Sequence, residues 1–93
     1  MRHFFSKDSN GVCLTFNDMR KVNDADSIPF YFEQLAMDDP EVFHYAEGTL
    51  PSIVPTKTYG FTLMELQALE GYLADNREII YELAYEYADG TRQ

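Results

Sequence analysis

The residues of this chain that are best placed to do chemistry are five carboxylates near its C-terminal end. They are Asp75, Glu78, Glu82, Glu86 and Asp89. Spacings of three and four residues place them in one line along an α-helix, and Arg77 points away from that line. Carboxylates in a row steer basic surfaces toward themselves. The sequence therefore predicts a site for a basic protein partner at the last four of these acids, with the amphipathic rings of Tyr81 and Tyr85 beside them.

The row can also be explained without a partner. Like charges at these spacings repel by roughly 0.2–0.5 kcal/mol per pair. Glu86 and Asp89 stand near the end of the predicted helix, where negative charge opposes the helix dipole. A solvated face that keeps a small acidic protein soluble is therefore the alternative to a binding surface.

Other reactive side chains have no spacing that suits catalysis or metal binding. His3, Cys13 and His44 are the potential soft ligands, and no two of them have the short spacing of a zinc site. Asp24 and Asp26 lack the third ligand position, the glycine and the distal glutamate of an EF-hand loop. No glycine-flanked serine and no phosphate-binding glycine loop occurs. We expect no metal, no cofactor and no enzymatic activity; a small enzyme with a carboxylate pair is the less favoured alternative.

Two amphipathic helices are predicted to position the acidic row. Thr62 followed by Glu65 is the spacing of a capping box, and leucines then recur three and four residues apart. Asp75 and Glu78 repeat the cap spacing, so we expect a break near Ala74 and a second helix that ends at Gly90. Its buried side is predicted to consist of Ile79, Ile80, Leu83, Ala84 and Tyr87.

A β-hairpin is predicted over residues 3–17. Asn10 and Gly11 are typical of a type I′ turn, which needs a positive φ at both central positions. Val12, Leu14 and Phe16 alternate with Cys13 and Thr15, which indicates a strand with one apolar face. Two strands alone are marginal in water, so this face must pack on the helices or gain a third strand.

The middle of the chain has weaker patterns. Residues 17–27 are polar and predict a loop. Pro29 after Ser27 favours a short helix over residues 28–37, although Phe30 and Phe32 alternate as in a strand. Asp39-Pro40-Glu41 predicts a second short helix that ends at Gly48, followed by a proline-rich extended connector. We therefore expect one α+β domain over residues 1–93, an N-terminal hairpin packed on a C-terminal pair of helices with one or two short helices between.

Charge narrows the choice of partner. The chain has 93 residues and a formal net charge of −9, and residues 22–56 hold seven acids and no Lys or Arg. Direct binding to nucleic acid is disfavoured because it is driven largely by neutralisation of phosphates. An acidic helix also disfavours a membrane surface. A basic protein surface, including that of a nucleic-acid-binding protein, is the favoured partner.

The expected compartment follows from the cysteine content and the N-terminus. Cys13 is the only cysteine, so no intramolecular disulfide can form and a reducing compartment is expected. Residues 1–8 lack the apolar run of a signal peptide, and no stretch approaches the roughly 18 apolar residues of a membrane span. We therefore expect a cytoplasmic protein.

In size and acidity the chain resembles the small inhibitors encoded by phages and mobile elements, among them anti-CRISPR proteins and DNA mimics. This resemblance of composition implies an inhibitor that blocks a nucleic-acid-binding site, and it transfers no individual residue. The alternative is a structural accessory subunit or a homodimer that uses exposed aromatic rings of the hairpin or of the Phe30–Phe32 region.

Overall fold

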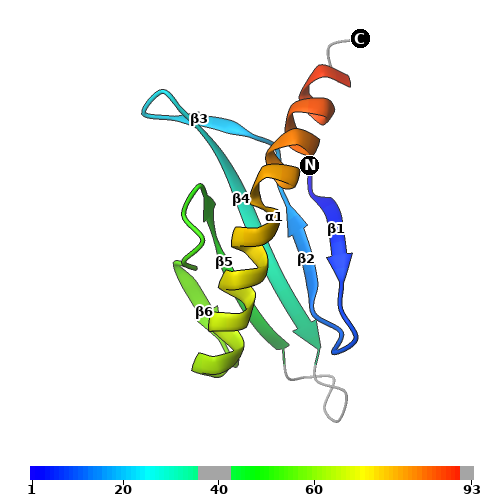
Figure 1. The fold of residues 1–93 in the computed structure, drawn as a ribbon, viewed down its shortest axis with the longest axis vertical. Helices are drawn as coiled ribbons and strands as arrows, with labels where there is room; N and C mark the ends of the chain where they lie inside the picture. Colours follow the sequence, from blue (N-terminus) through cyan, green and yellow to red (C-terminus); the bar gives the residue numbers. More distant parts are fainter. Residues whose placement is uncertain (36–42, 91–93) are drawn as a thin grey trace.

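The computed structural model describes residues 1–35 and 43–90, which form one antiparallel sheet and one helix in two layers (Figure 1). The elements are β1 (His3–Lys7), β2 (Cys13–Phe16), β3 (Arg20–Val22), β4 (Ala25–Leu35), β5 (Phe43–Leu50), β6 (Lys57–Tyr59) and α1 (Leu63–Gly90). The strand order is β1-β2-β4-β5-β6, and β3 pairs with the first part of β4. The predicted α+β class is therefore correct, whereas the predicted pair of helices is wrong.

A single helix replaces the expected pair because the apolar rows of the two predicted helices are in phase. At about 100° per residue, Leu73 and Ile80 project within about 20° of each other, so one straight helix buries both. No break near Ala74 is needed. The capping box at the start is confirmed: the Glu65 N–H donates to Thr62 Oγ1 (3.2 Å) and the Thr62 N–H donates to Glu65 Oε1 (2.8 Å). The hydrogen bond from Thr62 lowers the pKa of the Glu65 carboxyl.

The predicted loop over residues 17–27 is wrong in part, because β3 and the start of β4 pair there, and β4 replaces the predicted short helix over residues 28–37 as far as Leu35. Ile28, Phe30 and Phe32 are buried on the side of α1, which is the two-residue period of a strand. Pro29 is tolerated in this central strand because it lies opposite Asn17, where β2 has ended. The Asn17 N–H donates to the Pro29 carbonyl (2.9 Å). Between the pairs Phe16–Phe30 and Arg20–Ser27, residues 17–19 face residues 28–29, which is a bulge of one extra residue.

The predicted helix that ends at Gly48 is also wrong over its described part, because residues 43–48 belong to β5. Residues 39–42 lie outside the described residues. Ala46 pairs with Phe32 and Gly48 with Phe30, so the small residues of β5 lie beside the large rings of β4. A Cβ at Gly48 would come within 2.8 Å of the Phe30 ring, which explains the glycine. The expected extended connector contains β6, a three-residue strand at the sheet edge.

The turn of the first hairpin does not have the predicted type I′ conformation, which occurs in a second hairpin instead. The predicted hairpin of β1 and β2 is present, but its turn has a positive φ at Gly11 alone (84°), and Asp8 Oδ1 accepts the N–H groups of Asn10 and Val12. The pair of positive φ values typical of a type I′ turn occurs instead between β3 and β4, at Asn23 (51°) and Asp24 (65°). This second hairpin lies within the predicted loop.

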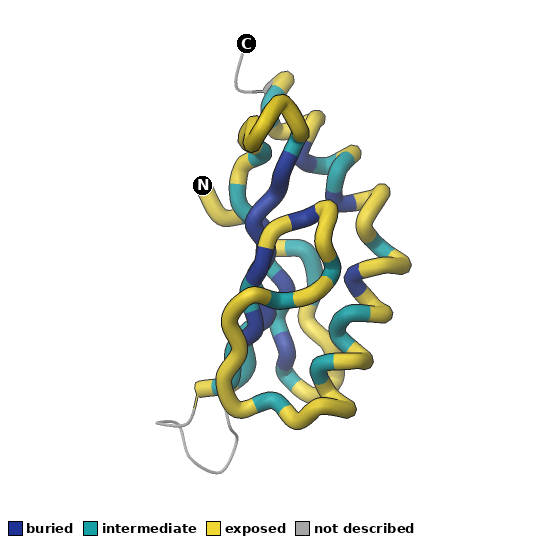
Figure 2. The backbone as a smooth tube through the Cα atoms, turned by 90° about the vertical axis from the view of Figure 1, so that its left-hand side faces the viewer, coloured by how far each residue is buried: buried dark blue, intermediate teal, exposed yellow. Residues whose placement is uncertain are grey.

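The core fills the space between α1 and one face of the sheet (Figure 2). Its largest fully buried side chains are Phe16, Phe30, Phe32, Leu14, Ile28, Leu50, Leu73 and Ile80. Burial of each such side chain stabilises the fold by roughly 1.5–3 kcal/mol. Two residues of the predicted helical core are not buried: Ile79 is 48% exposed and Tyr87 is 43% exposed.

Candidate functional site

The predicted acidic row forms a single exposed ridge along α1, here called the acidic ridge. Its residues, Asp75, Glu78, Glu82, Glu86 and Asp89, are all exposed. At about 100° per residue their side chains project within an arc of about 80°, opposite the buried Leu73, Ile80 and Ala84. At about 1.5 Å per residue the row is about 21 Å long. Because α1 is continuous, the ridge is one straight line that faces away from the sheet.

No carboxylate of the acidic ridge forms an ion pair within the part of the chain that the structure describes. The ion pairs of these residues involve Asp18, Glu33 and Asp26, and none involves a carboxylate of the ridge. Arg77, the nearest cation in sequence, donates from Nη1 to the carbonyl of Pro51 (3.0 Å). The negative charge of the ridge is therefore directed to solvent.

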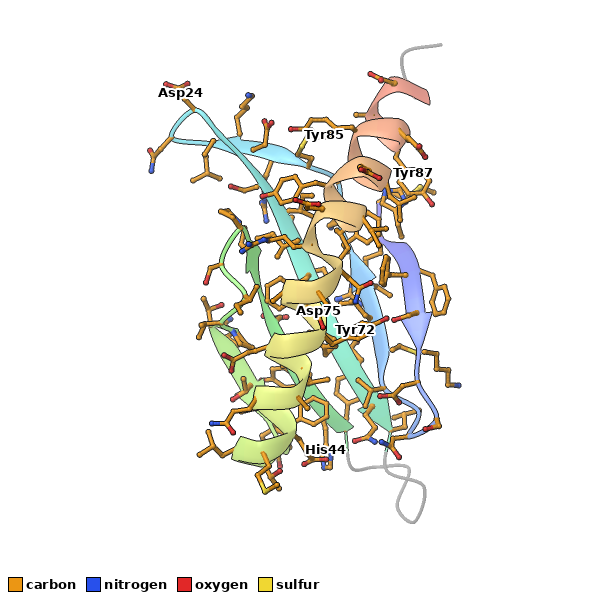
Figure 3. The ribbon with its side chains drawn as sticks, viewed as in Figure 1. Asp24, His44, Tyr72, Asp75, Tyr85 and Tyr87 are labelled. Carbon is orange, nitrogen blue, oxygen red and sulfur yellow. The ribbon has the colours of Figure 1, made fainter. Side chains whose placement is uncertain are left out.

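The two tyrosines lie beside the row, since they line one hollow with Glu78 and Glu82, and their hydroxyls bind the β3–β4 hairpin. Tyr81 Oη donates to the carbonyl of Asp26 (2.8 Å), and Tyr85 Oη donates to Asp26 Oδ2 (2.6 Å). Figure 3 shows Tyr85 extending from α1 toward this hairpin and Tyr87 extending toward β1. Lys21 completes the contact with an ion pair to Asp26 Oδ1 (2.9 Å). The tyrosines thus fix the orientation of the helix, while Tyr85 remains 46% exposed beside the carboxylates.

The same contacts shift the acidities of the groups involved. The hydrogen bond from Tyr85, assisted by Lys21, lowers the pKa of the Asp26 carboxyl. The bond to that carboxylate raises the pKa of Tyr85. Burial is the first cause of the raised pKa of Tyr81. All three shifts favour a neutral tyrosine beside an ionised aspartate, which is a structural contact rather than a proton-transfer site.

The potential metal ligands of the sequence are dispersed. His3 Nε2 is 2.7 Å from Asp18 Oδ1 and its ring stacks on Tyr87, with 4.0 Å between the ring centroids. His44 lies in β5, not in the expected helix, with Nδ1 3.2 Å from Gln34 Oε1. Among the described residues, no group of three or more His, Cys, Asp or Glu side chains could hold a metal ion.

No helix in this part of the chain is both long enough and apolar enough to cross a membrane.

A second surface, which the sequence did not predict, is the face of the sheet that α1 leaves uncovered (Figure 2). We call it the open face. It is formed by the residues that alternate with the buried ones, namely Phe4, Lys7, Cys13, Thr15, Tyr31, Glu33, Leu35, Phe43, Tyr45, Glu47, Lys57 and Tyr59, together with Arg2. The uncovered face of an antiparallel sheet is commonly polar, but here most of its positions are apolar or aromatic.

The open face was missed because its residues were assigned to other elements. The expected helices over residues 28–37 and 39–48 placed Tyr31 and Phe43 on helices, although Phe30 and Phe32 alternate as in a strand. The available signal was that β4 is apolar at both odd and even positions, as Phe30, Tyr31 and Phe32 show. A strand that is apolar on both faces has two surfaces to cover.

The chain was compared with protein-family models, with curated proteins and with solved structures, and none of the three comparisons found a match.

Proposed function

We propose that this chain is a non-enzymatic binding protein whose acidic ridge docks on a basic surface of a protein partner and blocks a nucleic-acid-binding site there. The observation that carries the proposal is the ridge itself: five exposed carboxylates in one line, opposite the buried side of α1 and without an ion pair among the described residues. Such a surface attracts cations over the Debye length and steers a basic partner into contact.

The acidic ridge lowers the stability of the isolated fold, which favours a role of these carboxylates in binding a partner. Glu78, Glu82 and Glu86 are successive neighbours at four-residue spacing, and each like-charge pair costs roughly 0.2–0.5 kcal/mol. The last turn of α1 has no basic residue, so Asp89 and the helix dipole oppose each other there. A basic partner would reduce both the repulsion between the carboxylates and the unfavourable interaction of Asp89 with the helix dipole.

The spacing of the charges indicates what kind of basic surface fits. Five carboxylates over about 21 Å give about one charge per 5 Å, whereas one strand of DNA carries a phosphate about every 3.4 Å. The ridge therefore suits a short basic cleft, of the length that holds a few nucleotides. A long duplex-binding groove would need a denser row of charge.

The proposal is tested by capture from a lysate of the source organism with two variants that change the net charge equally. Glu82→Gln/Glu86→Gln neutralises the centre of the ridge, and Asp24→Asn/Glu70→Gln neutralises two acids away from it. We expect the first pair to lose a nucleic-acid-binding protein that wild type and the second pair retain, and the purified protein to bind the ridge variant at least about tenfold more weakly.

Two results would contradict the proposal. One is equal binding of the partner by the ridge variant and the control, which would show that overall charge, not the ridge, attracts it. The other is a captured partner that still binds its nucleic acid with unchanged affinity when saturated with this protein.

A further inference from the structure

We propose that two copies of this chain associate through their open faces, with the two sheets packed against each other and the two helices outside. This inference rests on the sheet and is independent of the proposed function of the ridge. The resulting assembly would have four layers, in the order helix, sheet, sheet, helix.

The open face exposes more apolar surface than a solvated sheet does. Phe4 and Leu35 are 64% and 61% exposed, and Tyr59 is 61% exposed. They stand on β1, β4 and β6, so apolar side chains extend across the full width of the sheet. Phe4 and Leu35 line a hollow of about 460 Å³, and Phe43 lines both this hollow and a second one of about 270 Å³ beside Tyr45. Contiguous apolar surface of this kind marks an interaction site.

The charge of the open face identifies what can cover it. Its cations are Arg2, Lys7 and Lys57 and its anions are Glu33 and Glu47, a balance of +1 in a chain of net charge −9. A nucleic acid would require a more basic surface, and a basic protein would be attracted more strongly by the acidic ridge than by the open face. A second copy can approach this face without opposing strong charges of equal sign, whereas contact through the acidic ridges would repel.

The positions of these charges match the anatomy of an interface. Arg2 Nη1 is 2.7 Å from Glu33 Oε1 and its guanidinium lies 3.8 Å from the centroid of the Tyr31 ring, so the central charge is already paired and stacked. Lys7 and Lys57 lie on the two edge strands, β1 and β6. Packing two such faces would bury the rings of Tyr31, Phe43 and Tyr45 on the inner strands β4 and β5. Phe4 and Tyr59 would cover the edge strands beside the two lysines, whose charged ends stay in solvent at the rim.

The size of the face sets the expected strength. Five strands about 4.8 Å apart, with about six residues of about 3.3 Å each on average, give roughly 480 Å² per copy, or roughly 950 Å² in total. Specific interfaces begin at about 1,000 Å² and stable ones commonly bury about 1,600 Å². We therefore expect a dimer that dissociates on dilution.

The test is sedimentation of the full chain, with two variants that each replace two exposed apolar residues by acids. Wild type is expected to shift from the 10.8 kDa of one chain toward twice that mass as its concentration rises from about 5 to about 500 µM. Phe4→Glu/Tyr59→Glu on the open face should stay monomeric. Leu63→Glu/Met64→Glu at the start of α1, where both residues are exposed and acids suit the helix dipole, should dimerise like wild type.

Cys13 supplies a second readout that needs no substitution. It is half-buried on the open face, and its alkylation by a maleimide should slow at least about threefold in wild type over the same concentration range. A constant mass of one chain with an unchanged alkylation rate would overturn the inference. Equal loss of the dimer in both variants would also overturn it, since added charge alone would then explain the effect. Circular dichroism verifies that each variant is folded.

Discussion

The acidic ridge and the open face lie on opposite sides of the same two-layer fold and differ in every property that governs association. The ridge consists entirely of exposed carboxylates, whereas the open face has a charge balance of +1 and large exposed apolar side chains. Because α1 and the sheet separate the two surfaces, contact at one leaves the other accessible (Figure 2). Acid and basic groups are therefore unevenly distributed between the two surfaces, so the binding properties of the chain must be considered surface by surface.

The two surfaces should respond differently to salt. Interactions between exposed charges are largely screened once the Debye length falls to a few ångströms, as it does at about 1 M salt. Burial of apolar surface is not weakened by salt and is strengthened by strongly hydrated salts such as sulfate. Salt therefore distinguishes contact at the ridge from contact at the open face.

The largest expected effect is a loss of stability when a buried side chain that packs α1 on the sheet is truncated. Ile80 is 0% exposed, and Ile80→Ala should lower the free energy of unfolding by about 2–5 kcal/mol through lost burial and a cavity. Its neighbour Ile79 is 48% exposed, so Ile79→Ala is the matched control and should change stability by less than about 1 kcal/mol. Urea unfolding measures both. Similar losses for the two variants would contradict the described orientation of α1.

A charge reversal separates the two surfaces in a binding assay. Glu82→Lys/Glu86→Lys replaces two attractions by two repulsions, so affinity for the basic partner should fall by at least about tenfold. Calorimetric titration of the purified partner gives the affinity. The open-face variant Phe4→Glu/Tyr59→Glu should retain binding to the partner, and loss of partner binding in that variant alone would place the contact on the sheet.

Acid should loosen the contact that fixes the side of α1 next to the ridge. The hydrogen bond from Tyr85 holds the pKa of Asp26 below its ordinary value of 3.8. A carboxyl with a lowered pKa stabilises the fold above the pKa of the unfolded chain, and this contribution disappears as the pH falls through the folded pKa. The thermal midpoint of wild type should therefore fall relative to that of Asp26→Asn between about pH 5 and pH 2. Parallel midpoints over this range would show that the carboxylate charge contributes nothing.

The smallest expected effect has the opposite sign. Glu82→Gln/Glu86→Gln removes like-charge neighbours, each pair worth roughly 0.2–0.5 kcal/mol, so the variant should be slightly more stable than wild type at low salt. Thermal unfolding at low and high salt measures this gain, which should shrink as the charges are screened. A variant that is more stable yet binds its partner less well would show that the ridge serves binding at the expense of stability.

Local signals predicted the first hairpin and the start of α1 correctly, whereas the cap spacing of Asp75 and Glu78 wrongly predicted a break in the helix. The Thr62–Glu65 capping box starts α1 as expected, and the alternation of Val12, Leu14 and Phe16 produces the buried face of β2. Both signals depend on neighbours in sequence. The middle of the chain could not be assigned in this way, because Pro29 and Phe30 lie in a central strand only by virtue of their partners in β2 and β5. Long-range pairing thus overrode the local preference for a helix start.

The candidate site was likewise predictable only where its residues are neighbours in sequence. The spacing of the ridge acids along α1 is local, so all of them were found, and the exposed row appeared as expected. The role of Tyr85 was missed because its partner Asp26 lies 59 residues away in the chain. The open face was missed because it is assembled from five strands, and the local signal in β4 does not identify the strands that pair with it.

The measurement that tests the account most directly is capture from a lysate of the source organism on immobilised protein, with untagged copies of the chain added, at low and at high salt. The account predicts that a basic, nucleic-acid-binding protein is recovered at low salt and lost at high salt, while the untagged copy is recovered at both. If the heterologous partner resists salt, or if the untagged copy is lost together with it, the two surfaces do not divide their functions by charge as described.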